Sequence, residues 1–475
     1  MSDLEAEDIA TAATTTRRKP PLRLTPISLK RRILRGSAWL MVGKVVTTVL
    51  GLLINALLAR LLRPEDLGGF FTVFTLVAIG STIAQLGLDR AVVRLVSASL
   101  GTGQPGRARQ VIKVAFIVCG LASVVIGAVL VLGLGAWLAS HLYHSALLAG
   151  VMPVAAGWLV ASALQSLIVE TFRGMQRFAL ASIFDALLVD VLVATVVSSL
   201  WLLHSRPTLT QIVALFGAVT GVTVLVAGSI LFGRVREMRG EGHVDGMEIF
   251  SIAWPLLITN VATYMLGTGV DIWILGAFRP QQVVATYGAA SRLMFLVVTP
   301  FLVLQGVVAP LVAELSAQGR KHDLERTLRT VATMAGIPAI FALLIFLVFG
   351  SSVMGFFYGP FYRHGATILF ILSAGRLVAV WTGSCAIALM MTGYQRVLMY
   401  ITVGFGALSV LAGIVLAANF GAIGLAVSTA VVSAAQNVFT MFMARRRVGV
   451  WTTAYLSPRP FLAFFREQAS TPDPE

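Results

Sequence analysis

Charged residues are scarce in this sequence. Only 12% of the 475 residues are charged and 57% are apolar, whereas soluble chains carry about 25% charged residues. The mean hydropathy is correspondingly high, at +0.87. Because so little charge cannot cover a water-facing surface of this size, the composition excludes an ordinary soluble enzyme and predicts a polytopic membrane protein.

Residues and motifs that commonly carry out chemistry are also few. The two cysteines, Cys119 and Cys385, lie inside long apolar runs without the Cys or His spacing of a metal site, so we expect them to be core residues. The sequence has no Walker phosphate loop, no His-Glu-x-x-His motif and no glycine-rich dinucleotide motif in the required context. We therefore expect no catalytic residues, no metal and no cofactor.

Long apolar runs fill most of the chain. A membrane-spanning helix needs about 20 apolar residues, and twelve such runs occur between charged residues, glycine or proline. Because the runs are continuous rather than alternating, an all-α fold is favoured over a β-barrel. The twelve predicted spans are residues 36–59, 67–93, 111–138, 147–169, 178–203, 209–233, 250–276, 283–313, 331–358, 364–391, 397–418 and 420–443.

The basic residues are distributed unevenly between the predicted connections. With the amino terminus inside, 27 of the 36 Lys and Arg residues lie in cytoplasmic segments, five lie in the opposite connections and four lie within spans. Cytoplasmic loops of membrane proteins are enriched in Lys and Arg, so this asymmetry predicts that both termini are cytoplasmic. It also accounts for most of the net charge of +15 without a nucleic-acid partner.

Matching features recur in the two halves of the chain at a nearly constant offset. Each pair occupies an equivalent place among the predicted spans, and six spans separate the copies. We therefore predict two parallel six-helix repeats around a central cavity. The matching pairs are Arg63-Pro64 with Arg279-Pro280, Gly103 with Gly319, and Gly174-Met175-Gln176-Arg177 with Gly393-Tyr394-Gln395-Arg396, at offsets of 216, 216 and 219.

The spans and the repeat divide the chain into five predicted segments. The first 28 residues contain no apolar run, so we expect a disordered tail rather than a cleaved signal peptide. The predicted segments are a basic cytoplasmic tail (1–35), an N-terminal six-helix bundle (36–233), a cytoplasmic linker (234–249), a C-terminal six-helix bundle (250–443) and a second cytoplasmic tail (444–475).

A polar stripe recurs at equivalent places in the first and seventh predicted spans. Each stripe has residues spaced i, i+4, i+7 and i+11, which lie on one face of a helix. Two explanations stay open, because the stripes could line a cavity between the halves or form a polar seam within each half. The stripes are Lys44, Thr48, Gly51 and Asn55 in the first span and Asn260, Tyr264, Gly267 and Asp271 in the seventh.

Charged residues within the predicted spans are candidates for function, because a charge at the bilayer centre costs about 3 kcal/mol on insertion scales. Arg376 lies near the predicted midplane and is the strongest cavity candidate. Asp271 and Arg292 lie in the outer half and could instead pair with each other. Asp89 and Arg90, near the cytoplasmic end of the second span, could form a surface pair.

These considerations select two groups of candidate residues. One group would bind a substrate through cationic and amide side chains, and the other would carry a coupling ion on a carboxylate. The candidates for substrate binding are Lys44, Arg292, Arg376, Asn55 and Asn260, and the candidates for ion coupling are Asp271 and Asp190.

Three segments of the chain carry a recognisable set of motifs: Leu34-Arg35-Gly36-Ser37-Ala38-Trp39, Leu57-Leu58-Ala59-Arg60-Leu61-Leu62-Arg63-Pro64-Glu65-Asp66-Leu67-Gly68 and Gly393-Tyr394-Gln395-Arg396. These segments resemble the multidrug/oligosaccharidyl-lipid/polysaccharide (MOP) exporter superfamily, and within it the flippases for lipid-linked polysaccharide repeat units. The resemblance covers about residues 30 to 445. Its motifs are more specific for the superfamily than for the substrate.

This resemblance implies a secondary transporter of the bacterial inner membrane. Its cargo would be an oligosaccharide on a polyprenyl pyrophosphate, moved from the inner to the outer leaflet by alternating access coupled to an ion gradient. Membrane lipid and polysaccharide assembly proteins would be its partners. The alternatives are a multidrug antiporter for organic cations, which would favour an acidic cavity, and a membrane polysaccharide polymerase or ligase, which would need a longer outer loop.

Overall fold

In the computed structural model the chain folds into a bundle of long helices. The structure describes residues 26–143, 145–240, 244, 246–265 and 267–455, and no strand occurs within them. The helices are α2 (Pro26–Leu61), α3 (Pro64–Ala84), α4 (Leu88–Gly101), α5 (Pro105–Val129), η1 (Leu130–Leu134), α6 (Gly135–Trp137), η2 (Leu138–Leu142), α7 (Ala146–Gly174), α8 (Phe178–Ser182), η3 (Ile183–Leu187), α9 (Leu188–Leu202), α10 (Leu209–Glu237), α11 (Gly246–Met265), α12 (Thr268–Phe278), α13 (Gln281–Ala317), α14 (Lys321–Tyr358), η4 (Pro360–Gly365), α15 (Ala366–Thr382), α16 (Cys385–Met391) and α17 (Gln395–Val448).

The helices coincide with the long apolar runs of the sequence. Within the described residues, nine helices are long and apolar enough to cross a membrane, or ten when the bent pair α11 and α12 counts as one span. The 54-residue α17 has non-helical backbone at Gly421, so two helices meet there. The chain is therefore a multi-pass membrane protein. In α2 the apolar stretch Val45–Leu61 is shorter than these spans, and the count of twelve spans stays a prediction.

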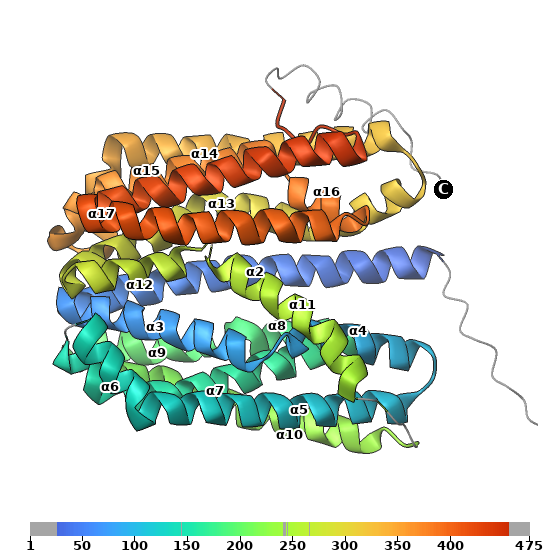
Figure 1. Cartoon of the computed structure of the whole chain (residues 1–475), viewed down its shortest axis with the longest axis horizontal. Coiled ribbons are helices and arrows are strands. Elements are labelled where there is room, and N and C mark those ends of the chain that lie inside the picture. The colour runs from blue at the N-terminus through green and yellow to red at the C-terminus, as the bar shows by residue number, and fades with distance from the viewer. Residues whose placement is uncertain (1–25, 144, 241–243, 245, 266, 456–475) are drawn as a thin grey trace, which may run out of the picture.

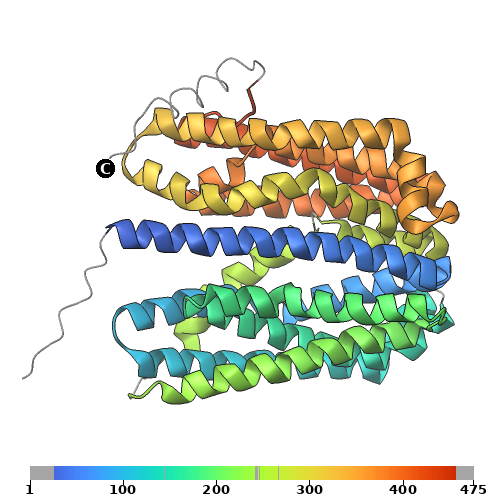
Figure 2. The same cartoon turned by 180° about the vertical axis from the view of Figure 1, so that it is seen from behind.

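Two groups of helices lie on either side of α2. Helices α3 to α10 form one group and α13 to α17 form the other, with α2 running between them in both views (Figures 1 and 2). Helix α11 slants from the centre of the molecule toward α4 (Figure 1), and residues of α11 share a hydrophobic cluster with α4 and α5. The two groups therefore meet along α2, α3, α11 and α13.

The same turn occurs at equivalent places in the two halves. Gly103 and Gly319 follow α4 and α13, with φ of +71° and +70°. In both turns the glycine amide donates to the carbonyl three residues earlier, at 3.2 and 3.1 Å, and the next amide donates to the carbonyl five residues earlier, at 2.8 and 3.0 Å. Glycine adopts this left-handed conformation at little cost. Two glycines 216 residues apart therefore end their helices with the same turn, as the predicted repeat requires.

Glycines interrupt two runs that we predicted to be single spans. Gly87 separates α3 from α4 with φ +77°, and a Cβ there would lie 2.1 Å from the Ala253 carbonyl oxygen of α11. Gly383 separates α15 from α16 with φ +74°, and a Cβ there would lie 2.1 Å from the Thr452 carbonyl oxygen. Continuous apolar composition concealed both breaks, because neither glycine disturbs the run.

The segment after α17 is packed against the bundle. The Thr452 hydroxyl donates to the Thr382 carbonyl oxygen at 2.6 Å, and the Tyr455 amide donates to the Thr333 hydroxyl at 2.8 Å. The first part of the predicted tail (444–475) is therefore packed against the helices, up to Tyr455. Residues 1–25 and 456–475 of the two predicted tails lie outside the described part of the chain.

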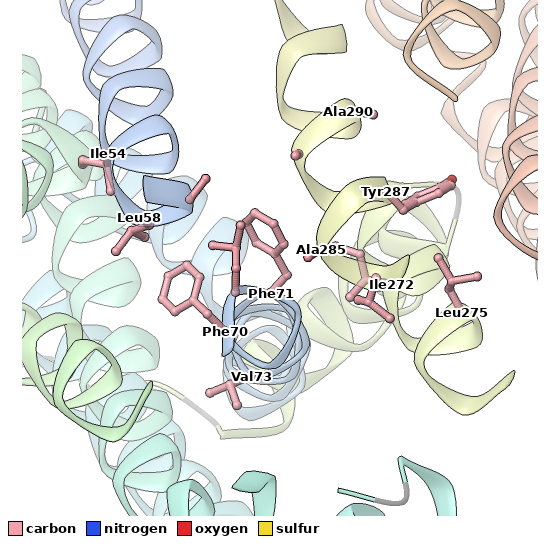
Figure 3. Packing of buried hydrophobic residues seen from close by; sticks show 14 of the residues in the cluster. Ile54, Leu58, Phe70, Phe71, Val73, Ile272, Leu275, Ala285, Tyr287 and Ala290 are labelled. Carbon is pink, nitrogen blue, oxygen red and sulfur yellow. The ribbon is translucent and has the colours of Figure 1, made fainter. Parts of the chain in front are cut away.

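A hydrophobic core joins the two groups where α3 meets α13. Phe71 of α3 is fully buried and lies beside Ala285 of α13 (Figure 3). A Cβ at Gly288 would lie 2.2 Å from the Phe71 ring, and a Cβ at Gly68 would lie 1.9 Å from the Gln281 carbonyl oxygen. The absence of side chains at these two glycines therefore permits the close approach of the two helices.

Candidate functional site

A polar cavity of about 600 Å³ lies between the two groups of helices. Helices α3, α4 and α7 line one side, and α11, α12, α13 and α15 line the other. Its polar lining is mostly hydroxyl and amide side chains, which both donate and accept hydrogen bonds. These hydroxyl and amide residues are Thr75, Ser81, Thr82, Gln85, Ser162, Ser166, Asn260, Thr263 and Tyr264.

Two arginines enter this cavity from the C-terminal half. Arg292 comes from α13 and Arg376 from α15. The guanidinium carbon of Arg292 lies 4.8 Å from the centre of the Phe74 ring and 5.7 Å from that of Phe71. Its Nε is buried and has no hydrogen-bond partner in the described part of the chain. Neither arginine forms an ion pair with a described acid, so both are available to an anion.

One acidic side chain, Asp89 of α4, also lines the cavity. The Asn260 side-chain amide donates to its Oδ2 at 3.1 Å, across the contact between α4 and α11. Arg90 Nε lies 3.9 Å from the same oxygen, and the Arg90 side chain is 66% exposed. The predicted pair of Asp89 and Arg90 therefore exists, but Asp89 itself is buried in the cavity wall rather than on the surface.

The polar stripe of the seventh span divides between a cavity and a seam. Asn260, Tyr264 and Gly267 line the cavity, and the Tyr264 hydroxyl donates to the Thr75 carbonyl oxygen at 3.1 Å. Asp271 is absent from the lining. Helices α11 and α12 are bent by 56°, and the bend carries Asp271 away from the face that holds the other three residues.

Asp271 lies in a buried polar cluster inside the C-terminal group. Only 3% of it is exposed, and its Oδ2 accepts hydrogen bonds from the Tyr287 hydroxyl at 2.6 Å and the Thr429 hydroxyl at 2.9 Å. It also interacts electrostatically with Arg376. The alternative pairing of Asp271 with Arg292 does not occur among the described ion pairs.

Two of the other candidate residues, Asn55 and Asp190, are absent from the cavity lining. Lys44 belongs to α2, but its side chain lies outside what the structure describes. The Asn55 amide donates to the Gly51 carbonyl oxygen of its own helix at 2.6 Å. Asp190 is half-buried on α9. Of the predicted substrate-binding residues, the structure thus brings Arg292, Arg376 and Asn260 to one cavity.

The sequence did not identify Asp89, or the hydroxyl residues of α3 and α7, as residues that line the cavity. The pattern that could have revealed Asp89 is Gly87-Leu88-Asp89, since a glycine just before an acid in an apolar run allows a break that exposes the carboxylate to a cavity. Ser162 and Ser166 are four residues apart and share one face of α7. Such spacing of serines is common in membrane helices, so it offered little signal.

Comparison with known proteins places the chain in a family. A family model described as "Polysaccharide biosynthesis protein" matches residues 33–316, more than half of the chain. The chain is 23% identical over 208 residues to a protein of Haloferax volcanii named probable low-salt glycan biosynthesis flippase Agl15. This alignment covers 42% of the chain and 43% of that relative, so it spans less than half of either protein.

Several solved structures share the fold, two of them from transporters of different kinds. One is an inward-facing multidrug resistance MATE family transporter of the MOP superfamily, with a TM-score of 0.67, 13% identity and coverage of 85% of this chain and 94% of that one. The other is the lipid II flippase MurJ in an inward closed conformation, with a TM-score of 0.68, 15% identity and coverage of 92% and 93%. The chain therefore belongs to the polysaccharide biosynthesis protein family and has the membrane-transporter fold of the MOP superfamily.

Proposed function

We propose that this protein is a flippase that moves a polyprenyl-pyrophosphate-linked oligosaccharide from the inner to the outer leaflet of the bacterial inner membrane. The observation that carries the proposal is the pair of arginines, Arg292 and Arg376, which line the central cavity and form no ion pair with a described acid. Both chain termini would lie in the cytoplasm, as the distribution of basic residues indicates.

The chemistry of arginine suits a pyrophosphate. Its guanidinium stays charged and offers paired N–H groups that match phosphate oxygens. A buried charge without a partner is costly, so an anion that enters the cavity replaces an unfavourable state with a favourable one. The stacking of Arg292 on Phe74 holds its guanidinium in place before the anion arrives.

The opposite wall of the cavity suits the sugar. Hydroxyl groups of Ser81, Thr82, Ser162 and Ser166 line it from α3 and α7. Ser81 and Thr82 donate their protons to the Ala78 carbonyl oxygen, and Ser166 donates its proton to the Gln85 side-chain oxygen. Their oxygens therefore remain as acceptors for sugar hydroxyls. The proposed cargo therefore places its pyrophosphate on the arginines of the C-terminal group and its sugars against the N-terminal group.

Contacts between the two groups provide the parts of an alternating-access cycle. At one end Gly68 and Gly288 allow α3 and α13 to pack closely, and at the other end Gly87 allows α4 to pack against α11. Rocking of the groups would separate one contact while it preserves the other. The cargo would enter and leave through the separated end.

Asp271 is the proposed coupling residue. It lies behind Arg376, within electrostatic reach of it but outside the cavity lining. An ion or proton that binds Asp271 would change the field at Arg376 and so the affinity for pyrophosphate. By linkage, the cargo would change the affinity for the ion by the same factor.

A complementation experiment tests the flippase assignment. Cells that lack the protein should accumulate the lipid-linked oligosaccharide with its sugars facing the cytoplasm. The wild-type chain should restore surface polysaccharide, and the double variant Arg292→Gln/Arg376→Gln should not. The matched control is Arg94→Gln/Arg396→Gln, which removes two exposed cations outside the cavity.

The same strains separate the alternatives. Full restoration by the double arginine variant would contradict the proposal. Restored efflux of organic cations, without an effect on polysaccharide, would assign the chain to multidrug antiport. Transfer of sugar by the purified protein without movement between leaflets would assign it to a polymerase or ligase.

A further inference from the structure

An apolar groove lies on the far side of α7 from the central cavity. It has a volume of about 510 Å³ and runs between α5, α7 and α10. Ser162 and Ser166 of α7 line the cavity, whereas Leu164 and Ile168 line the groove. Two residues correspond to about 200° around a helix. The groove therefore lies on the outer surface of the N-terminal helices and is separate from the proposed cargo site.

The walls of the groove are apolar and leave room for an alkyl chain. A Cβ at Gly228 would meet no atom closer than the Ile168 Cδ1, at 3.8 Å. Phe232 on its edge is 69% exposed, so the groove opens onto the outside of the bundle. The apolar lining includes Ile112, Phe116, Leu164, Ile168, Val224 and Phe232.

Three cations stand together at one end of this groove. Arg109 and Lys113 are four residues apart near the start of α5, so they share one helix face. Arg236 is in the last turn of α10. None of the three pairs with a described acid. The Arg109 Nε is buried and has no hydrogen-bond partner within the described residues.

We propose that this groove binds an anionic phospholipid of the bilayer. The phosphate would contact Arg109, Lys113 and Arg236, and one acyl chain would lie along the apolar walls. The groove has its cations at one end and its apolar surface beyond them, which is the order of headgroup and chain in a phospholipid. Basic pockets between membrane helices are suited to such headgroups. Because the groove is separate from the proposed cargo site, its binding of lipid does not depend on the cargo.

Native mass spectrometry of the full-length protein in detergent tests the proposal. Phosphatidylglycerol and phosphatidylcholine of identical acyl chains serve as probes. We expect the wild-type chain to prefer phosphatidylglycerol on the order of 100-fold, since each cation near an anionic headgroup strengthens binding about fivefold. The acyl-free headgroup, glycerophosphoglycerol, should not compete, because it leaves the apolar walls uncovered.

Charge and shape are tested by separate variants. Arg109→Gln/Lys113→Gln/Arg236→Gln should remove most of the preference. The control Arg94→Gln/Arg396→Gln/Arg447→Gln loses the same net charge from exposed positions and should keep it. Gly228→Leu should weaken the binding of both lipids by filling the groove without altering charge.

Three results would overturn the proposal. The first is equal retention of the two lipids by the wild-type chain. The second is an equal loss of preference in the groove variant and in the exposed-cation control. The third is effective competition by glycerophosphoglycerol, which would indicate a plain phosphate site. If the triple variant does not fold, Arg236→Gln alone should lower the preference about fivefold.

Discussion

Replacing Arg376 with glutamine should weaken pyrophosphate binding by about 10- to 150-fold. The side chain lines the cavity and forms no ion pair with a described acid. The Asp271 carboxylate interacts with it only electrostatically, so its N–H groups are free to bind an anion. A hydrogen bond to a charged group contributes about 1.5 to 3 kcal/mol, and each 1.4 kcal/mol is a tenfold change in the dissociation constant. Arg376→Lys keeps the charge but loses the paired N–H groups. Its affinity for pyrophosphate should therefore lie between those of the wild-type chain and of Arg376→Gln.

Arg292→Gln should weaken pyrophosphate binding over the same range, because it also removes a charged hydrogen-bond donor. The variant also loses the contact of Arg292 with Phe74. Since this contact exists before the anion binds, its loss should lower the stability of the free protein rather than the affinity. If both arginines hold one pyrophosphate, the losses of affinity in the single variants should not add in the double variant.

Calorimetric titration of the purified chain with farnesyl pyrophosphate measures these affinities. Farnesol serves as the uncharged comparison, and Arg94→Gln serves as the control variant because Arg94 is exposed and lies outside the cavity lining. Farnesyl pyrophosphate should bind the wild-type chain and the control equally. Unchanged affinity in Arg376→Gln, or equal affinity for farnesol, would refute the assignment of the arginines to the pyrophosphate.

Three further predictions concern the surroundings of the arginines. Asp271→Asn should leave transport in proteoliposomes insensitive to an imposed proton or sodium gradient, and transport that still follows both gradients would remove Asp271 from the coupling role. Asp89→Asn should raise the affinity for farnesyl pyrophosphate on the order of fivefold, because it removes a negative charge from the cavity wall; a lower affinity would argue against an anionic cargo. Gly68→Ala should separate α3 from α13, since its Cβ would lie 1.9 Å from the Gln281 carbonyl oxygen; in an Ala285→Cys background, where Ala285 is fully buried, the thiol should then react faster with a water-soluble maleimide, and an unchanged rate would contradict this closure.

The helices were predictable because they depend on local composition. An apolar run long enough to cross a membrane has few alternatives to a helix. The equivalence of Gly103 and Gly319 was predictable because a left-handed turn after a helix selects glycine in both halves. Arg292 and Arg376 were predictable as cavity residues because a charge within a span must avoid lipid.

The orientation of individual side chains depended on bends that the sequence conceals. The stripe from Asn260 to Asp271 assumed one straight helix, whereas the 56° bend between α11 and α12 sends Asp271 into the C-terminal group. Asp89 reaches the cavity wall because Gly87 breaks its span and lets α4 approach α11. Both outcomes are decided by packing between segments distant in the chain, which periodicity within one segment does not report.

Movement of a lipid-linked oligosaccharide between leaflets is the central claim, and reconstitution tests it most directly. Proteoliposomes would carry a fluorescent oligosaccharide on polyprenyl pyrophosphate, and a membrane-impermeant quencher would report its leaflet. The wild-type chain should move the label across the bilayer, and Arg292→Gln/Arg376→Gln should do so no faster than protein-free liposomes. Equal rates for the wild-type chain and protein-free liposomes, with the protein folded, would contradict the account.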